Sequence, residues 1–178
     1  MSRYDWPDEF KRVYGAGLKR YQAGQKSPRN LFDGEDLAFL ATIGCSGQEL
    51  FDFIDDGERY GEPSYEDTLL VTSVRREYFI QVLKGGSGGP VVDMASLPAK
   101  SAAIDGIPWL LRLIEKARAK LNGTMPDELM YGCGGDRPFL RNMNVPLADF
   151  LRVVWQHGDN DRAIIDFVKQ SAAQREKK

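Results

Sequence analysis

Five polar residues within a short stretch carry the chemical groups that a small-molecule or enzymatic site uses. They are Lys116, Arg118, Tyr131, Cys133 and Asp136. A cysteine becomes a useful nucleophile when a cation or a helix N-terminus lowers the pKa of its thiol. Cys133 comes shortly before an expected helix, and Lys116 would lie close to it if the chain between them turns back. Lys116 and Arg118 would then line a pocket for an anionic ligand.

The same residues have a purely structural interpretation. Cys133 would be a buried thiol, while Lys116 and Arg118 would lie on a solvated face or pair with Asp136. A cysteine nucleophile usually needs a nearby base, and the chain has a single histidine, His157, in an expected turn. One histidine without partners at ligand spacing does not make a metal site. The sequence therefore predicts no metal and no cofactor, contains no complete catalytic set, and leaves open whether the protein is an enzyme.

Helices are expected to position these side chains. The helix that carries the two basic residues should open at Asp105, with Pro108 in its first turn, and end at Gly123. Apolar residues recur along it at the spacing of a helix with one buried face. Asp136 is expected to cap a further helix through Met143, and two more helices are expected after it.

A sequence similarity between two segments of the chain predicts the architecture. Residues 34–40 read Gly-Glu-Asp-Leu-Ala-Phe-Leu, and residues 134–140 read Gly-Gly-Asp-Arg-Pro-Phe-Leu. Apolar pairs continue the match downstream, and Gly24 and Gly123 each end a basic helical stretch upstream. Two copies of one helical module explain this pattern.

We therefore predict an all-α protein of two related four-helix modules packed together. Residues 1–83 form the first module, residues 84–105 a glycine-rich linker and irregular crossing, and residues 106–178 the second module. The linker begins with Lys84 and continues Gly-Gly-Ser-Gly-Gly-Pro. A phosphate-binding loop would need a Lys-Ser/Thr pair after it and a strand before it, and both are missing. A flexible connection is the interpretation that remains.

Composition indicates a soluble globular protein. Apolar residues make up 42% of the 178 residues and charged residues 28%, which are ordinary values for that class. The longest apolar run, residues 107–114, contains Arg112 and is far shorter than the ~20 residues of a bilayer span. The N-terminal residues lack the apolar core of a secretory signal. Two cysteines build no disulfide framework, so we expect a cytoplasmic protein without membrane contact.

Charge is unevenly distributed between the two halves. Residues 1–83 hold 10 basic and 15 acidic residues, and residues 84–178 hold 14 and 11, so the halves carry −5 and +3. This asymmetry would attract the halves to each other or to a neighbouring subunit. Neither half is basic enough for nonspecific nucleic-acid binding. A helix-turn-helix interpretation of residues 37–54 fails as well, since the would-be recognition helix is acidic.

The C-terminal half resembles a bacterial family known as domain of unknown function 5069. The resemblance rests on residues 106–124, on Tyr131-Gly132-Cys133, on Asp136, and on two Phe-Leu-containing helices at residues 139–140 and 150–151. It spans residues 97–168 and departs from the family at residues 134–135, which are both glycine. It implies a helical fold and no mechanism.

The function expected from these observations is non-catalytic. The duplicated apolar helices, the charge asymmetry and the incomplete catalytic set favour a module that binds a protein partner or self-associates. The alternative is a small-molecule or enzymatic site made by the five polar residues named at the outset.

Overall fold

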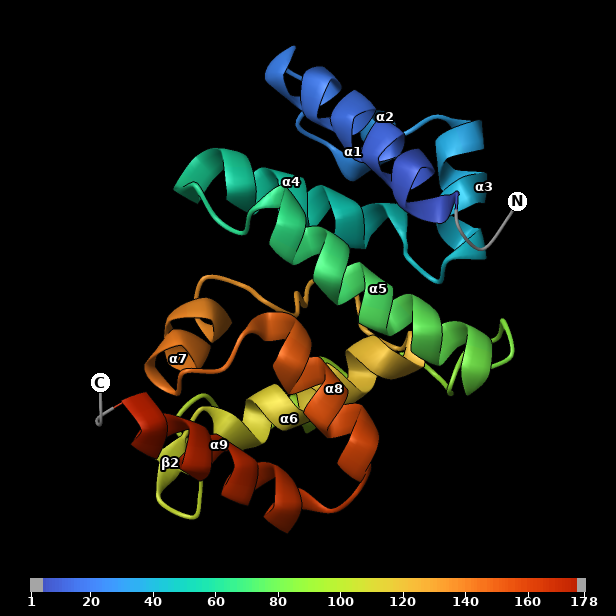
Figure 1. The fold of residues 1–178 in the computed structure, drawn as a ribbon. Coiled ribbons are helices and arrows are strands. Elements are labelled where there is room, and N and C mark those ends of the chain that lie inside the picture. The colour runs from blue at the N-terminus through green and yellow to red at the C-terminus, as the bar shows by residue number, and fades with distance from the viewer. Residues whose placement is uncertain (1–4, 176–178) are drawn as a thin grey trace. The chain divides into compact units, whose positions relative to one another are not determined.

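The computed structural model describes residues 5–175, and most of them lie in α-helices (Figure 1). The predicted helical fold class is therefore confirmed. The chain divides into two compact units, Met1–Arg76 and Glu77–Lys178, and each is described by itself. The boundary between them falls inside one long helix. The predicted division into residues 1–83, 84–105 and 106–178 stays a prediction.

The first unit is built from α1 (Trp6–Gln22), α2 (Pro28–Leu31), α3 (Gly34–Thr42), α4 (Gly47–Tyr60) and the first part of α5 (Tyr65–Gln81). Helix α1 packs on α2 and α4. Gly17 permits a close approach there, because a Cβ at this position would lie 2.7 Å from the Phe32 ring. The core of the unit is aromatic and aliphatic, and its fully buried members include Phe10, Val13, Leu31, Leu40, Leu50 and Ile54.

Local side-chain bonds define where the helices of this unit begin. Asp33 accepts from the backbone N–H groups of residues 35 and 36 and so caps α3. Ser46 Oγ accepts from the Glu49 N–H at 3.1 Å, and Glu49 Oε2 accepts from the Ser46 N–H at 2.9 Å. This reciprocal pair of bonds is a capping box. Ser64 and Asp67 make the same kind of exchange before α5.

The second unit begins in the last turn of α5 and continues with a 3-10 turn, a hairpin and four helices. These are η1 (Met94–Ser96), β1 (Ala103–Ile104), β2 (Ile107–Pro108), α6 (Leu110–Asn122), α7 (Asp136–Asn142), α8 (Leu147–His157) and α9 (Asp161–Arg175). Helix α8 packs against both α6 and α9. Its buried face includes Phe150, Leu151 and Val154, which meet a core contributed by all three helices.

The expected start of the helix at Asp105 is wrong. Residues 103–108 form a small antiparallel hairpin in which Ile104 pairs with Ile107. Asp105 (φ 54°) and Gly106 (φ 79°) both have positive φ, as a tight two-residue hairpin turn requires. Pro108 lies in β2, and α6 begins two residues later.

Two turns in different units have the same hydrogen-bond pattern one hundred positions apart. Between α3 and α4, the Cys45 N–H donates to the Leu40 carbonyl at 3.0 Å. Between α7 and α8, the Val145 N–H donates to the Leu140 carbonyl at 2.9 Å. The left-handed position of the first turn is glycine, residue 44, and that of the second is Asn144 (φ 57°), a residue type that tolerates this conformation.

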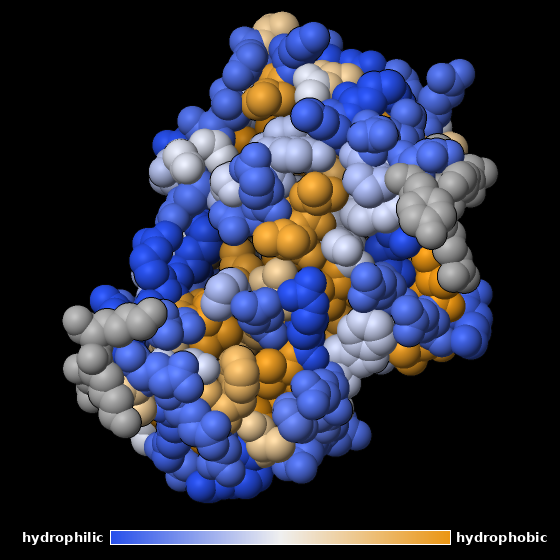
Figure 2. Space-filling view, viewed as in Figure 1, coloured by the Kyte–Doolittle hydropathy of each residue, from blue (hydrophilic) through white to orange (hydrophobic). Residues whose placement is uncertain are grey.

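On the face drawn in Figure 2 the surface is mostly hydrophilic, with smaller groups of apolar side chains between. Large apolar side chains with more than a third of their surface exposed include Leu37, Tyr60, Leu70, Val82, Val91 and Met94. Within residues 5–175, no helix by itself combines the length and the apolar character of a bilayer span. Helices α3 and α4 meet that test only as a pair, and they are bent by 102° where they join.

The capping box of α4 generates a stability prediction. Replacing Ser46 by Ala removes the side-chain acceptor for the Glu49 N–H, and we expect the free energy of unfolding to fall by about 1 kcal/mol. Urea unfolding followed by circular dichroism measures the change. The matched control is Ser27→Ala, since Ser27 precedes α2 without a side-chain cap bond and should cost much less. Equal losses in the two variants would contradict the assigned role of the box.

Candidate functional site

The structure brings Lys116, Cys133 and Asp136 together. Lys116 projects from α6, Cys133 lies in the turn before α7, and Asp136 is the first residue of α7. The Lys116 ammonium donates to Asp136 Oδ2 and lies 3.3 Å from Cys133 Sγ. Lys116 is 2% exposed and Asp136 is fully buried, whereas Cys133 is partly exposed. The sequence-predicted approach of Lys116 to the Cys133 turn is present in the fold.

Asp136 is held by two further donors. The Gly132 N–H donates to its Oδ2 at 2.9 Å, and the Trp109 indole N–H donates to its Oδ1 at 3.0 Å. Gly135 makes room for the indole, because a Cβ at residue 135 would lie 2.3 Å from the Trp109 ring. Trp109 itself has a positive φ of 70°, which is unusual for a bulky side chain. Asp136 thus accepts from the backbone, an indole and an ammonium, and it does not act as the simple helix cap that we expected.

Tyr131 lies in the same region but turns its hydroxyl elsewhere. Its side chain is buried, and its hydroxyl donates to the Leu147 carbonyl at 2.7 Å. Burial raises the pKa of Tyr131 well above its ordinary value, with smaller contributions from the negative charges of Asp136 and Asp149. The phenol therefore stays protonated in the folded protein and acts as a buried donor.

Arg118 is bound to a different set of residues. Its guanidinium pairs with Glu115 and Asp161, at 2.6 Å each, and donates to the Gly158 carbonyl at 2.8 Å. It also lines a small hollow of about 100 Å³, whose lining residues are Tyr78, Arg118, Leu121, Asn122, Val154, Trp155, Gly158 and Asp159. Lys116, Tyr131, Cys133 and Asp136 do not line this hollow. The structure therefore assigns Arg118 to other contacts than those of the remaining candidate residues.

The region that contains all five candidates matches a described family. Residues 96–178 match the model of a domain of unknown function, DUF5069. No curated protein matches the chain, and no solved structure matches it either. We call residues 96–178 the DUF5069 region; it includes the hairpin and helices α6 to α9. The predicted family resemblance is confirmed for this part of the chain.

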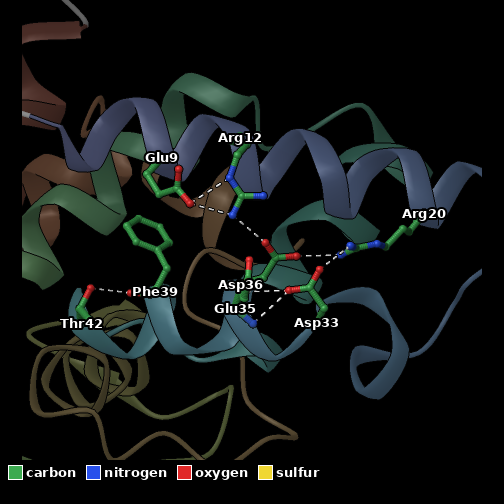
Figure 3. A network of polar contacts seen from close by, with 8 residues as sticks. All are labelled: Glu9, Arg12, Arg20, Asp33, Glu35, Asp36, Phe39 and Thr42. Carbon is green, nitrogen blue, oxygen red and sulfur yellow. Dashed lines mark hydrogen bonds and ion pairs between the residues drawn. The ribbon is translucent and has the colours of Figure 1, made fainter. Parts of the chain in front are cut away.

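A second buried carboxylate, which the sequence analysis missed, lies outside the DUF5069 region. Figure 3 shows Arg12 and Arg20 reaching from α1 to Asp36 on α3. Asp36 Oδ1 accepts from Arg12 at 2.9 Å, Oδ2 accepts from Arg20 at 2.8 Å, and the carboxylate side chain is 1% exposed. The hydrogen bonds that Arg12 donates to Glu9 and to Asp36, in that order of size, raise the pKa of Arg12. The sequence comparison of residues 34–40 with 134–140 aligned Asp36 with Asp136, but it gave no indication of the arginine partners.

The two clusters share a paired buried carboxylate, but a thiol lies beside the cation in the DUF5069 region. In both, a buried carboxylate is neutralised by a cation from the preceding long helix, so the charged groups are already paired. In the DUF5069 region, the sulfur of Cys133 adjoins the buried ammonium, and Cys133 is a partly exposed residue. Among residues 5–175, no group of three or more His, Cys, Asp and Glu side chains has the arrangement of a metal site.

Removing the Asp136 charge should destabilise the second unit strongly. Asp136→Asn leaves the buried ammonium of Lys116 without its counter-charge, and breaking a buried pair from one side costs about 3 kcal/mol or more. Chemical denaturation measures the loss. The control is Asp166→Asn, which removes an ion pair with Arg162 whose side chains are 41% and 68% exposed, and which should cost less than about 1 kcal/mol. If Asp136→Asn lowers the free energy of unfolding as little as the control does, the buried pair does not stabilise the unit to the extent expected.

The buried phenol generates a pH prediction. The unfolded chain releases the Tyr131 proton near pH 10. Because the folded state holds that proton at higher pH, the unfolded state binds fewer protons there and stability falls as pH rises above about 10. Tyr131→Phe removes this dependence, so the variant should lose about 1 kcal/mol at neutral pH from the missing bond to Leu147 and progressively less at higher pH.

Urea unfolding at several alkaline pH values, compared with the unsubstituted protein, tests this expectation. The control is Tyr60→Phe at an exposed side chain, for which the difference from the unsubstituted protein should stay small throughout. A stability difference for Tyr131→Phe that does not shrink between neutral pH and about pH 11 would contradict the linkage.

Proposed function

We propose that this protein is a non-catalytic helical module that associates with other protein chains, its own copies in the first instance. The observation that carries the proposal is that the polar cluster of the DUF5069 region is buried and hydrogen-bonded within its own unit. Lys116, Tyr131 and Asp136 are each no more than 2% exposed, and their polar atoms bond to groups of the same unit. A buried network that is already satisfied stabilises a fold and has no open donor or acceptor for a substrate.

The charge distribution supports association as the mode of action. Residues 1–83 carry a net charge of −5 and residues 84–178 a net charge of +3. Opposite charges on different copies attract, and salt weakens such attraction between exposed groups. Exposed apolar side chains such as Tyr60 (67%) and Val91 (65%) add surface that a partner could cover. A cytoplasmic location belongs to the proposal, since both cysteines are free thiols.

An internal duplication is also part of the proposal. Two related modules, residues 1–83 and 106–178, would be joined through the glycine-rich stretch that begins at Lys84. Three features support it: the matching turns after α3 and α7, the buried carboxylates Asp36 and Asp136 at equivalent positions, and a basic side chain reaching each from the preceding long helix. A duplicated module presents two similar surfaces, which suits a protein that binds copies of one partner.

A small-molecule site is the second candidate function. What favours it is the position of Cys133, which is partly exposed and lies 3.3 Å from the buried ammonium of Lys116. An anionic ligand that reaches this thiol would meet a positive group behind it. Tyr131 and Asp136 would then support the site from within, while Arg118 would act elsewhere.

The association proposal predicts a mass that depends on concentration and salt. Sedimentation equilibrium should show a weight-average mass that rises with protein concentration in about 50 mM salt and falls toward the monomer in about 500 mM salt. Reversing two exposed acidic residues of the first half, Glu35→Lys with Glu66→Lys, should weaken association at low salt. The matched control, Glu35→Asp with Glu66→Asp, keeps the charge and should associate normally. A strict monomer under every condition would refute the proposal.

A further inference from the structure

The contact between Cys133 and Lys116 places two nucleophilic atoms side by side with a proton acceptor behind them. The sulfur and the lysine nitrogen are 3.3 Å apart, and the same nitrogen donates to the Asp136 carboxylate. The lysine is 2% exposed, so its nitrogen is held in place by packing, whereas the cysteine is a partly exposed residue. We propose that this pair is a redox modification site: a hydroperoxide oxidises Cys133, and Lys116 then forms a covalent bond between its Nζ and the Cys133 sulfur. This modification goes beyond the proposed association function.

The first step is oxidation of the thiol. The sulfur of Cys133 attacks one oxygen of hydrogen peroxide and forms an S–O bond as the O–O bond breaks. The sulfur loses two electrons to the peroxide, the departing oxygen takes the thiol proton, and the products are a sulfenic acid and one water. Hydrogen peroxide is small enough to reach a partly exposed sulfur, and the oxidant is the only co-reactant that the step consumes.

The second step joins the two side chains. The carboxylate of Asp136 takes one proton from the Lys116 ammonium, to which it is already hydrogen-bonded. The free amine attacks the sulfur of the sulfenic acid, an S–N bond forms, and the S–O bond breaks. The departing hydroxide takes a second proton from the nitrogen and leaves as water. A sulfenic acid condenses with a nitrogen nucleophile in this way to give a sulfenamide.

The charge balance of the site favours this outcome. Before the reaction, the buried ammonium and the buried carboxylate neutralise each other. After it, the nitrogen is neutral and Asp136 is protonated, so neither partner is left as an unpaired buried charge, which would be costly. Asp136 keeps the Trp109 and Gly132 donors on its two oxygens throughout.

Mass spectrometry of the peroxide-treated full chain tests the proposal. After one equivalent of hydrogen peroxide under native conditions, we expect an intact mass lower by about 2 Da, because a direct S–N bond removes two hydrogens. Digestion should give one cross-linked pair of peptides that contains Lys116 and Cys133, and dithiothreitol should restore the starting mass. Lys116→Arg, which keeps the cation without a primary amine, should instead accumulate a sulfenic acid that dimedone traps on Cys133.

The other cysteine supplies the matched control. Cys45 is buried in the first unit, and its thiol contacts the Ser46 carbonyl at 3.5 Å. Cys45→Ser should retain the cross-link, and Cys133→Ser should abolish it, with circular dichroism showing that both variants are folded. An unmodified Cys133, a sulfenic or higher acid on Cys133 beside an unlinked Lys116, or a disulfide-linked dimer would each overturn the proposal in the unsubstituted protein.

Discussion

The structure depends on the neutralisation of carboxylates that the fold removes from water. A buried carboxylate without a counter-charge is far more costly than the few kcal/mol by which a domain is stable. Asp36 and Asp136 are both fully buried, and each meets basic side chains from the long helix that precedes it. Each pairing restricts where a short helix sits against a long one. Apolar packing, which is less directional, then fills the space around these contacts.

The same constraint shapes the candidate site. Because the Lys116 ammonium is paired with the Asp136 carboxylate, the lysine is not a free cation at the surface of the DUF5069 region. Cys133, by contrast, is a partly exposed residue, and its sulfur lies next to a nitrogen that is hydrogen-bonded to a carboxylate. A cluster that stabilises the fold therefore also places a reactive pair in contact. Structural and chemical roles are compatible here, since they use different atoms of the same three residues.

Sequence reasoning succeeded where the deciding interactions are local. The helix end at Gly123, which has a left-handed conformation, depends on neighbours within a few positions. The predicted helix start at Asp105 was wrong, because an aspartate three residues before a proline fits both a helix start and a hairpin turn. Grouping Lys116 with Arg118 ignored the helix period: residues two apart are about 160° from each other around the helix axis and so face nearly opposite sides.

The amino-acid sequence by itself determined that the chain is helical and that the helix carrying Lys116 ends at Gly123 with one apolar face buried. It also aligned residue 36 with residue 136 in the proposed repeat, without showing that their carboxylates are buried. Tertiary packing alone decided that Lys116 reaches Cys133 and Asp136, across 17 and 20 positions of the chain. The physical reason is range: caps and apolar periodicity act within a turn or two of helix, whereas an ion pair between helices exists only once the helices have packed.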